Sequence, residues 1–240
     1  MKIKLGYSTG VFWNYDISLK EKVKLLLEID QEAIEVMFNK PEALSQIPDS
    51  ETLDLIKKFK YRSIHAPMKE VHYSQAKCED LIDKLLLIAE TIGAHTILFH
   101  PVNIEDYKWL GNKVGNIIAF ENMDNRQHFG KTVKDLKSVY DKVPHAKWVF
   151  DVNHLYTHNP TLSKVNLYQK ALGKRLCHYH FSGFGSFHDC ISITKENVMF
   201  SGITDLTKPI ISEGSDKKMK DVIKKEHKYI LDYLSRDSSS

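Results

Sequence analysis

The chain reads NIIAFEN at positions 116–122, KTVKDLKSVYDKV at positions 131–143 and KWVFDV at positions 147–152. The first and third segments are short, rich in β-branched and aromatic residues, and carry a polar residue at or next to their end, which is typical of buried strands. The middle segment spaces its apolar residues three and four positions apart, as one face of a helix does. The three segments together therefore predict a strand, a helix and a second strand of a parallel sheet.

The same alternation extends along the whole chain. Eight apolar runs of this kind occur, at positions 3–8, 33–38, 62–66, 95–100, 116–122, 147–152, 175–181 and 208–214. Helical periodicity fills most of the intervals, with Gly93 and Gly173 expected to end helices and Ser50 and Thr161 expected to begin them. Eight such units fit the ~250 residues typical of a closed barrel. We predict a single (β/α)8 TIM-barrel domain over residues 1–240, with residues 237–240 disordered.

A doubly wound open sheet is the alternative fold. That fold normally carries a glycine-rich GxGxxG turn after its first strand, and Tyr7-Ser8-Thr9-Gly10 does not have this pattern. The closed barrel is therefore favoured. The segment 183–207 reads as a long loop with a brief helical turn, and long loops in compact domains are usually functional or disordered. A lid over the site and a disordered loop both remain open for it.

Composition and charge exclude several protein classes. With 42% apolar and 27% charged residues, the chain has the composition of a soluble globular protein. A formal net charge of +3 does not by itself mark a nucleic-acid binder. No segment has the ~20 apolar residues that span a bilayer, and the N-terminus lacks a signal peptide's apolar run. Three cysteines without CxxC spacing indicate neither a disulfide framework nor a zinc ribbon. We expect a cytoplasmic protein whose oligomeric state is open.

The residues that end the predicted strands are rich in metal ligands. Active sites of parallel barrels lie at the carboxyl ends of the strands, so these positions are the candidates. The candidates are His65, His100, Glu121, Asp151 with His154 one turn later, His178, His180 and Glu213, together with His188 and Asp189 of the loop after the seventh run. Burying so many ionisable groups together is costly unless a cation neutralises the carboxylates and binds the imidazoles. The coincidence therefore predicts a metal centre.

The predicted ligands are nitrogen and oxygen atoms without a thiolate. This set suits Zn²⁺, Mn²⁺, Co²⁺ or Fe²⁺ rather than Ca²⁺ or a sulfur-bound structural zinc. Cys177 is expected to pack, because the strand period of two places its neighbours His178 and His180 on the opposite face. His180 lies nearer the rim and is the predicted ligand, with His178 lower in the barrel. We predict one to three divalent ions.

The strand-end motifs also resemble a known family. In order they are His65-Ala-Pro, His100-Pro, Glu121-Asn, Asp151-Val-Asn-His154, His180-Phe-Ser-Gly followed by His188, and Ser212-Glu213-Gly. This series covers nearly the whole chain and resembles the xylose isomerase-like TIM barrel superfamily, which includes endonuclease IV and the sugar isomerases and epimerases. No single motif is specific, whereas the ordered set is.

Resemblance to the ketose epimerases implies one ligand set. Glu121, Asp151, His180 and Glu213 correspond to the four ligands of a single Mn²⁺ or Co²⁺, and His154 would contact the substrate. The epimerases also carry an arginine after the seventh strand that this chain lacks.

Resemblance to endonuclease IV implies a larger set. His65 and His100 correspond to ligands of one further zinc, and His154 and His188 to ligands of another. The endonucleases have an Asp-x-His pair after the seventh strand, where this chain has His188-Asp189. The chain therefore departs from both patterns.

Two chemistries follow from these residues. The favoured one is isomerisation or epimerisation of a small sugar-like hydroxy-carbonyl compound, in which Glu121 and Glu213 remove and return a proton on opposite sides of a metal-bound substrate. Trp13 and Trp109 are candidates for stacking on the sugar, with rim packing equally open. The alternative is zinc-dependent hydrolysis of abasic DNA, which His65 and His100 favour.

The chain has short loops after its first strands and no Lys/Arg-rich loop to neutralise a run of phosphates, so a nucleic-acid substrate is not favoured. A barrel that binds a ligand without catalysing a reaction is a third interpretation. Retention of every strand-end carboxylate argues against it.

Overall fold

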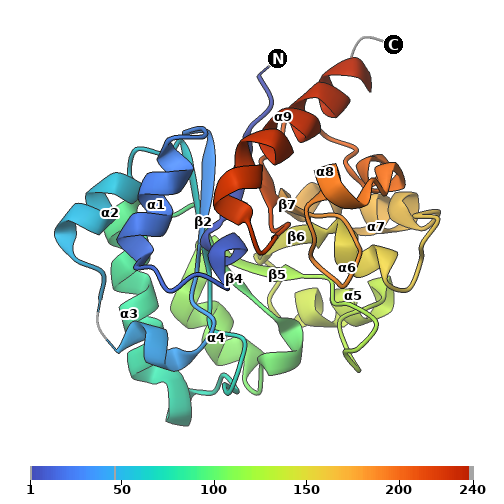
Figure 1. The fold of residues 1–240 in the computed structure, drawn as a ribbon. Coiled ribbons are helices and arrows are strands. Elements are labelled where there is room, and N and C mark those ends of the chain that lie inside the picture. The colour runs from blue at the N-terminus through green and yellow to red at the C-terminus, as the bar shows by residue number, and fades with distance from the viewer. Residues whose placement is uncertain (1, 46, 238–240) are drawn as a thin grey trace.

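Eight parallel strands pair in chain order, and β1 pairs with both β2 and β8, so the sheet closes on itself (Figure 1). The computed structural model describes residues 2–45 and 47–237. The strands are β1 Leu5–Ser8, β2 Ala33–Met37, β3 Tyr61–His65, β4 Thr96–Phe99, β5 Ile118–Glu121, β6 Lys147–Asp151, β7 Leu176–Phe181 and β8 Ile210–Ser212. The predicted TIM barrel is confirmed, and the open sheet is excluded.

Gly6 allows β1 and β2 to approach closely. A Cβ atom at this position would lie 2.0 Å from the carbonyl oxygen of Ala33, so no other residue fits without moving a strand. Gly6 pairs with Ala33 on one side and with Ile211 of β8 on the other. The residue therefore sits at the point where the barrel closes.

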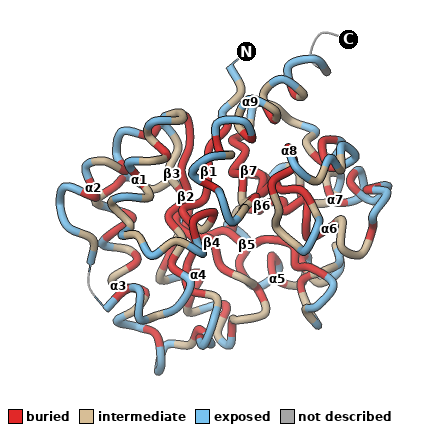
Figure 2. The backbone as a smooth tube through the Cα atoms, in the orientation of Figure 1, coloured by how far each residue is buried: buried red, intermediate tan, exposed pale blue. Residues whose placement is uncertain are grey.

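Helices surround the barrel, and their outer faces are exposed (Figure 2). They are α1 Leu19–Leu27, α2 Ser50–Ile56, α3 Gln75–Ile92, α4 Tyr107–Val114, α5 Val133–Lys142, α6 Val152–Tyr156, α7 Val165–Leu172, α8 Ile191–Thr194 and α9 Met219–Asp237. Among the described helices, none combines the length and the apolar character needed to cross a membrane.

Helix ends follow the sequence signals in part. Gly93 ends α3 in the left-handed conformation, as expected, with φ at 62°. Gly173 also follows the last residue of α7, but in a right-handed conformation. Asp49, rather than Ser50, caps α2, and α7 begins after Lys164, later than Thr161 predicts.

The sequence predicts disorder from Asp237 onwards. Asp237 is instead the last residue of α9. The other residues of that prediction, 238–240, lie outside the described residues.

Most of the core fills the space between the strands and the surrounding helices. A second, small cluster comprises Leu98, Ala119 and Val149 on the neighbouring strands β4, β5 and β6. Because side chains alternate along a strand, the residues two positions later share the same face. These residues are His100, Glu121 and Asp151. The apolar cluster therefore lies beneath three of the predicted ligands.

The segment 183–207 is not a structureless loop. It contains α8 and a 3₁₀ turn over Asn197–Gly202. The buried carboxylate of Glu226, on α9, accepts hydrogen bonds from the backbone N–H groups of Ile191 and Ser192 at 2.9 and 2.8 Å. The first turn of α8 is therefore held against α9, while movement of the segment as a lid remains a prediction.

Candidate metal centre

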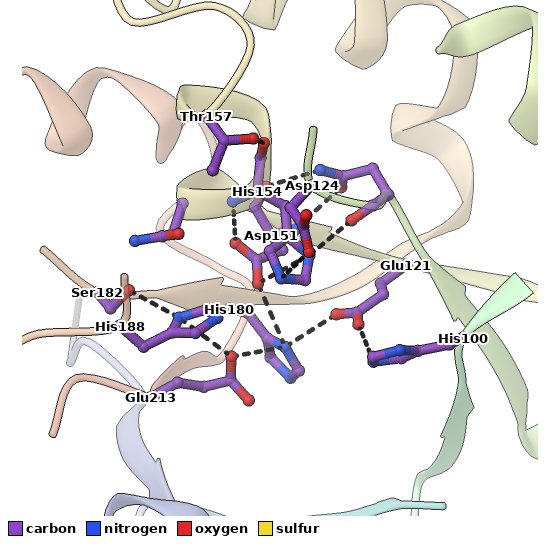
Figure 3. Close-up of polar contacts among 12 residues, drawn as sticks. His100, Glu121, Asp124, Asp151, His154, Thr157, His180, Ser182, His188 and Glu213 are labelled. Atoms are coloured by element: carbon purple, nitrogen blue, oxygen red, sulfur yellow. Dashed lines mark hydrogen bonds and ion pairs between the residues drawn. The ribbon is translucent and has the colours of Figure 1, made fainter. Parts of the chain in front are cut away.

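A cavity of about 1120 Å³ opens at the carboxyl end of the barrel. Six of the eight predicted metal ligands line its wall: His65, His100, Glu121, His154, His188 and Glu213. Asp151 and His180 are fully buried and lie among these residues (Figure 3). The structure thus brings all eight predicted metal-ligand residues to one place.

Glu121 lies at the middle of the group and faces two sets of donors. Its Oε1 atom lies 2.6 Å from His100 Nε2 and 4.0 Å from His65 Nε2. Its Oε2 atom lies 3.1 Å from His180 Nδ1. The two imidazole Nε2 atoms of His65 and His100 are 3.2 Å apart. One carboxylate therefore belongs to two groups of ligand atoms.

Three carboxylates surround Nδ1 of His180. Glu121 Oε2 is 3.1 Å away, Glu213 Oε2 is 3.5 Å away and Asp151 Oδ2 is 4.0 Å away. The four side chains come from the consecutive strands β5, β6 and β7 and from the residue after β8. This is the mixed nitrogen and oxygen set that a divalent transition metal prefers.

A third group of donors comprises Asp151, His154 and His188. Nδ1 of His154 is 3.3 Å from Asp151 Oδ2, and Nδ1 of His188 is 3.8 Å from Glu213 Oε2. Asp124 adds a carboxylate at the cavity wall, with its Oδ2 atom 4.0 Å from His154 Nε2. A third set of ligand atoms therefore adjoins the other two.

The sequence Asp151-Val-Asn-His154 folds locally so that both ends of the motif reach the site. Asp151 is the N-cap of α6, and its side chain accepts a hydrogen bond from the backbone N–H of His154 at 2.7 Å. The side chain of Asn122 exchanges two hydrogen bonds with the backbone of Asp151, at 2.7 and 3.0 Å. These contacts fix the Asp151 backbone between β5 and α6.

Several buried atoms of the centre lack a hydrogen-bond partner of good geometry among the described residues. They are both carboxylate oxygens of Glu121, Oδ2 of Asp151 and Nδ1 of His180. Buried polar atoms are normally paired, so unpaired ones point to a missing partner. All four atoms are of ligand type, and they face one another across short distances. The residues therefore fit a divalent cation.

Electrostatics differ across the centre. Burial would raise the pKa of Glu121, but the adjacent His100 outweighs it and holds the pKa well below its usual range. Burial and the neighbouring His100 lower the pKa of His65 to about 4, so its imidazole is neutral at pH 7 and has a free lone pair. Burial, opposed by His180, raises the pKa of Glu213 to about 8. A bound cation would favour the ionised form of this carboxylate.

The two predicted stacking residues lie in different places. Trp13 is 71% exposed, lines the cavity and donates a hydrogen bond from Nε1 to Ser215 Oγ at 3.2 Å. Trp109 lies on α4, partly buried against the core, and is not among the residues that line the cavity. The structure therefore does not bring Trp109 to the site.

Sequence reasoning missed two acidic residues of the site region. Glu35, on β2, lies fully buried beside His178 and His180. Asp124 follows β5 and forms an ion pair with Arg126 at 3.0 Å. A signal for Glu35 was present, since it is an isolated acidic residue inside the apolar run 33–38. His178 is lower in the barrel, as expected, with Nδ1 2.8 Å from the Tyr61 hydroxyl.

No protein-family model and no curated protein sequence matches the chain. Several solved structures, in contrast, match the chain. Endonuclease IV from Thermus thermophilus matches with a TM-score of 0.68 at 13% identity, covering 97% of this chain and 99% of that one. The 3-keto-D-glucoside 4-epimerase from E. coli gives 0.66 at 14% identity, with 96% and 99% covered. D-allulose 3-epimerase from a Methylomonas species gives 0.66 at 16% identity, with 97% and 98% covered.

These neighbours are all enzymes, and they share their architecture with this chain over nearly its full length. At such low identity the likeness concerns the fold and not the reaction. The comparisons therefore show the fold of this chain, a (β/α)8 barrel that it shares with sugar epimerases and with endonuclease IV.

Proposed function

We propose that the chain is a divalent-metal-dependent phosphoester hydrolase whose centre holds at least two cations bridged by Glu121. The observation that carries this proposal is the division of the Glu121 carboxylate between two donor groups, His65 with His100 on one side and Asp151 with His180 on the other. Two metal ions about 3.5–4 Å apart are characteristic of enzymes that displace groups at phosphorus.

The residues have separate roles in this proposal. Glu121 joins the two metal subsites, Asp151 and His180 complete the deeper one, and His65 and His100 complete the one at the cavity wall. Cations held there would act as Lewis acids on a phosphoryl oxygen and lower the pKa of a water molecule. Glu213, at the cavity surface, is placed to accept the proton of an attacking water.

The cavity rim supports an anionic substrate. Lys69, Lys217 and Lys218 line it, and none of the three has an ion pair within the described part of the chain. Three lysines can neutralise one or two phosphates but not an extended run of them. A phosphoester that enters the cavity by a single group therefore fits better than a long duplex track. Abasic DNA remains the specific prediction within this class.

Hydrolysis of bis(p-nitrophenyl) phosphate and nicking of an abasic duplex oligonucleotide test the proposal. The metal-loaded protein should hydrolyse at least one of them, and a chelator should abolish the reaction. Glu121→Gln should lower the rate on the order of 10³-fold, because several kcal/mol of charge stabilisation is lost. A metal-loaded protein that hydrolyses neither substrate would contradict the proposal.

Sugar isomerisation is the second candidate, and a specific observation favours it. Glu121 and Glu213 lie 3.1 and 3.5 Å from the same His180 nitrogen, so two carboxylates flank one cation position. In that reaction the two carboxylates would move a proton between adjacent substrate carbons. Solvent deuterium should then enter a ketose only with metal and an intact Glu213. Exchange that persists in Glu213→Gln would exclude this role.

Two further expectations concern the protein in the cell. All three cysteines are free, which agrees with a reducing compartment. The cytoplasmic location itself remains a prediction.

A further inference from the structure

A carboxylate that no proposed reaction uses lies beneath the metal centre. Glu35, in the middle of β2, has 0% of its surface exposed. Its Oε1 atom lies 3.1 Å from His180 Nε2, and its Oε2 atom lies 3.2 Å from the same nitrogen. A buried charge in this position is costly unless it makes strong interactions. The interaction with His180 is therefore central to what Glu35 does.

The two nitrogens of His180 face opposite ways. Nε2 faces Glu35, whereas Nδ1 faces Glu121 and Glu213. A neutral imidazole carries one proton, and only the nitrogen without it can bind a metal ion. Carboxylates on both sides compete for that proton. Whichever carboxylate accepts it determines whether Nδ1 is a ligand.

Hydrogen bonds fix the position of the Glu35 carboxylate. The Ser63 hydroxyl donates to Oε2 at 2.9 Å, and Thr96 in turn donates to Ser63 at 2.9 Å. His178 places its Nε2 atom 3.5 Å from Oε2. The polar network therefore joins Glu35 on β2 to side chains of β3, β4 and β7.

We propose that Glu35 is a positioning residue that holds the His180 proton on Nε2 and so keeps Nδ1 free to bind a cation. This inference rests on the metal centre of the proposed function, but not on the reaction catalysed. A carboxylate behind a metal-binding histidine orients the ring and strengthens its bond to the metal. Glu35 therefore contributes to metal affinity without touching the metal or the substrate.

Zinc affinity, measured by competition with a chromogenic chelator, tests this role. Glu35→Leu should weaken binding by about 10- to 100-fold, as other losses of such partners do. Glu35→Gln should retain most of the affinity, because its amide oxygen still accepts from Nε2. Ser63→Ala is the matched control, since it removes a hydrogen bond to Glu35 and leaves the Glu35–His180 contact. Its effect should be smaller than that of Glu35→Leu.

A second measurement keeps the inference testable if Glu35→Leu folds poorly. The ¹⁵N shifts of the His180 ring in the wild-type protein, assigned with His180→Asn, report which nitrogen carries the proton. We expect the proton on Nε2 in the zinc-loaded protein, and a shift of population to Nδ1 in metal-free Glu35→Leu.

The outcomes separate this inference from the proposed function. A wild-type proton on Nδ1, or unchanged zinc affinity in Glu35→Leu, would overturn the role of Glu35 and leave the metal centre standing. An Nε2 atom that is unprotonated because a cation lies between Glu35 and His180 would overturn it as well. Absence of zinc binding by the wild-type protein would instead refute the proposed function.

Discussion

The two ends of the barrel treat their polar side chains differently. At the amino end, Lys147 donates to the carbonyl oxygen of His95 at 2.8 Å, and Arg175 donates to the carbonyl oxygen of Ala146 at 3.1 Å. At the carboxyl end, Glu121 and Asp151 bury carboxylate oxygens that lack a hydrogen-bond partner of good geometry among the described residues and face imidazoles instead. The two cations at the amino end thus have partners in the protein's own backbone.

This contrast indicates at which end of the barrel a bound ligand is needed. At the amino end these two cations hydrogen-bond to backbone carbonyl oxygens, whereas ionised carboxylates cannot hydrogen-bond to one another. Several carboxylates and imidazoles buried together require a cation or a proton between them. If the proposed metal centre is correct, the carboxyl end needs a bound cation, and variants at the two ends should differ most in metal-dependent properties.

The largest difference is expected for a matched pair of variants. Glu121→Gln should lower phosphoester hydrolysis on the order of 10³-fold, because both proposed subsites lose a ligand. Lys147→Met, at the amino end, should leave the rate within about twofold, because Lys147 is not among the residues that line the cavity. Steady-state rates of the two zinc-loaded variants check this. Equal rates for Glu121→Gln and Lys147→Met would contradict the proposed difference between the two ends of the barrel.

Metal removal should destabilise the protein. Zinc at 100 times its dissociation constant stabilises a folded protein by about 2.7 kcal/mol, if the unfolded chain does not bind it. For a chain of this size that corresponds to a Tm higher by roughly 5–10 °C. Calorimetry with zinc and with a chelator measures the difference, and Asp151→Asn should reduce it. The same Tm in both conditions would argue against a cation at the carboxyl end.

The pH dependence of the metal-free protein should report Glu213. Its folded-state pKa of about 8 exceeds the ordinary value of 4.5, so the folded state binds this proton more tightly. The stabilisation is fully present below about pH 4.5 and is lost as the pH rises towards 8, by at most about 1.4 kcal/mol per pH unit. In Glu213→Gln the free energy of unfolding should decrease less as the pH rises. Denaturant unfolding in chelator between pH 5 and pH 8 checks this, and parallel curves for both proteins would contradict it.

The smallest effects concern the two tryptophans. Trp13→Ala should raise KM a few-fold with little change in kcat or stability, because Trp13 is exposed at the cavity rim. Trp109→Ala should leave KM unchanged and lower stability, because Trp109 packs partly buried against the core. Kinetics and thermal unfolding of both variants test the pair. A raised KM in Trp109→Ala, with an unchanged KM in Trp13→Ala, would instead place the substrate over α4.

The sequence predicts the barrel and its strand ends well for a physical reason. Alternating short apolar runs and helical stretches carry the fold, and the strand period of two carries Glu121 and Asp151 to the same face. It predicts less where a residue's role depends on a partner in another strand. Glu35 lies inside an apolar run, and only the closure of β2 and β7 around the barrel interior brings it to His180.

Trp109 shows that nearness in the sequence to a strand end does not guarantee a place at the site. Its position shortly after β4 places it near the site in sequence, but the 3₁₀ turn Pro101–Asn103 and the start of α4 at Tyr107 carry it away from the cavity.

The geometry also alters the choice between reactions. Sequence favours isomerisation, whereas the shared carboxylate of Glu121 favours a centre with more than one metal ion.

Zinc quantification by elemental analysis, after loading and extensive dialysis, tests the central claim most directly. Wild-type protein should retain at least two zinc ions per chain, His100→Ala should retain at least one fewer, and Glu121→Gln should lose more than His100→Ala does. One ion or none per wild-type chain, with the same value in His100→Ala, would contradict a centre bridged by Glu121.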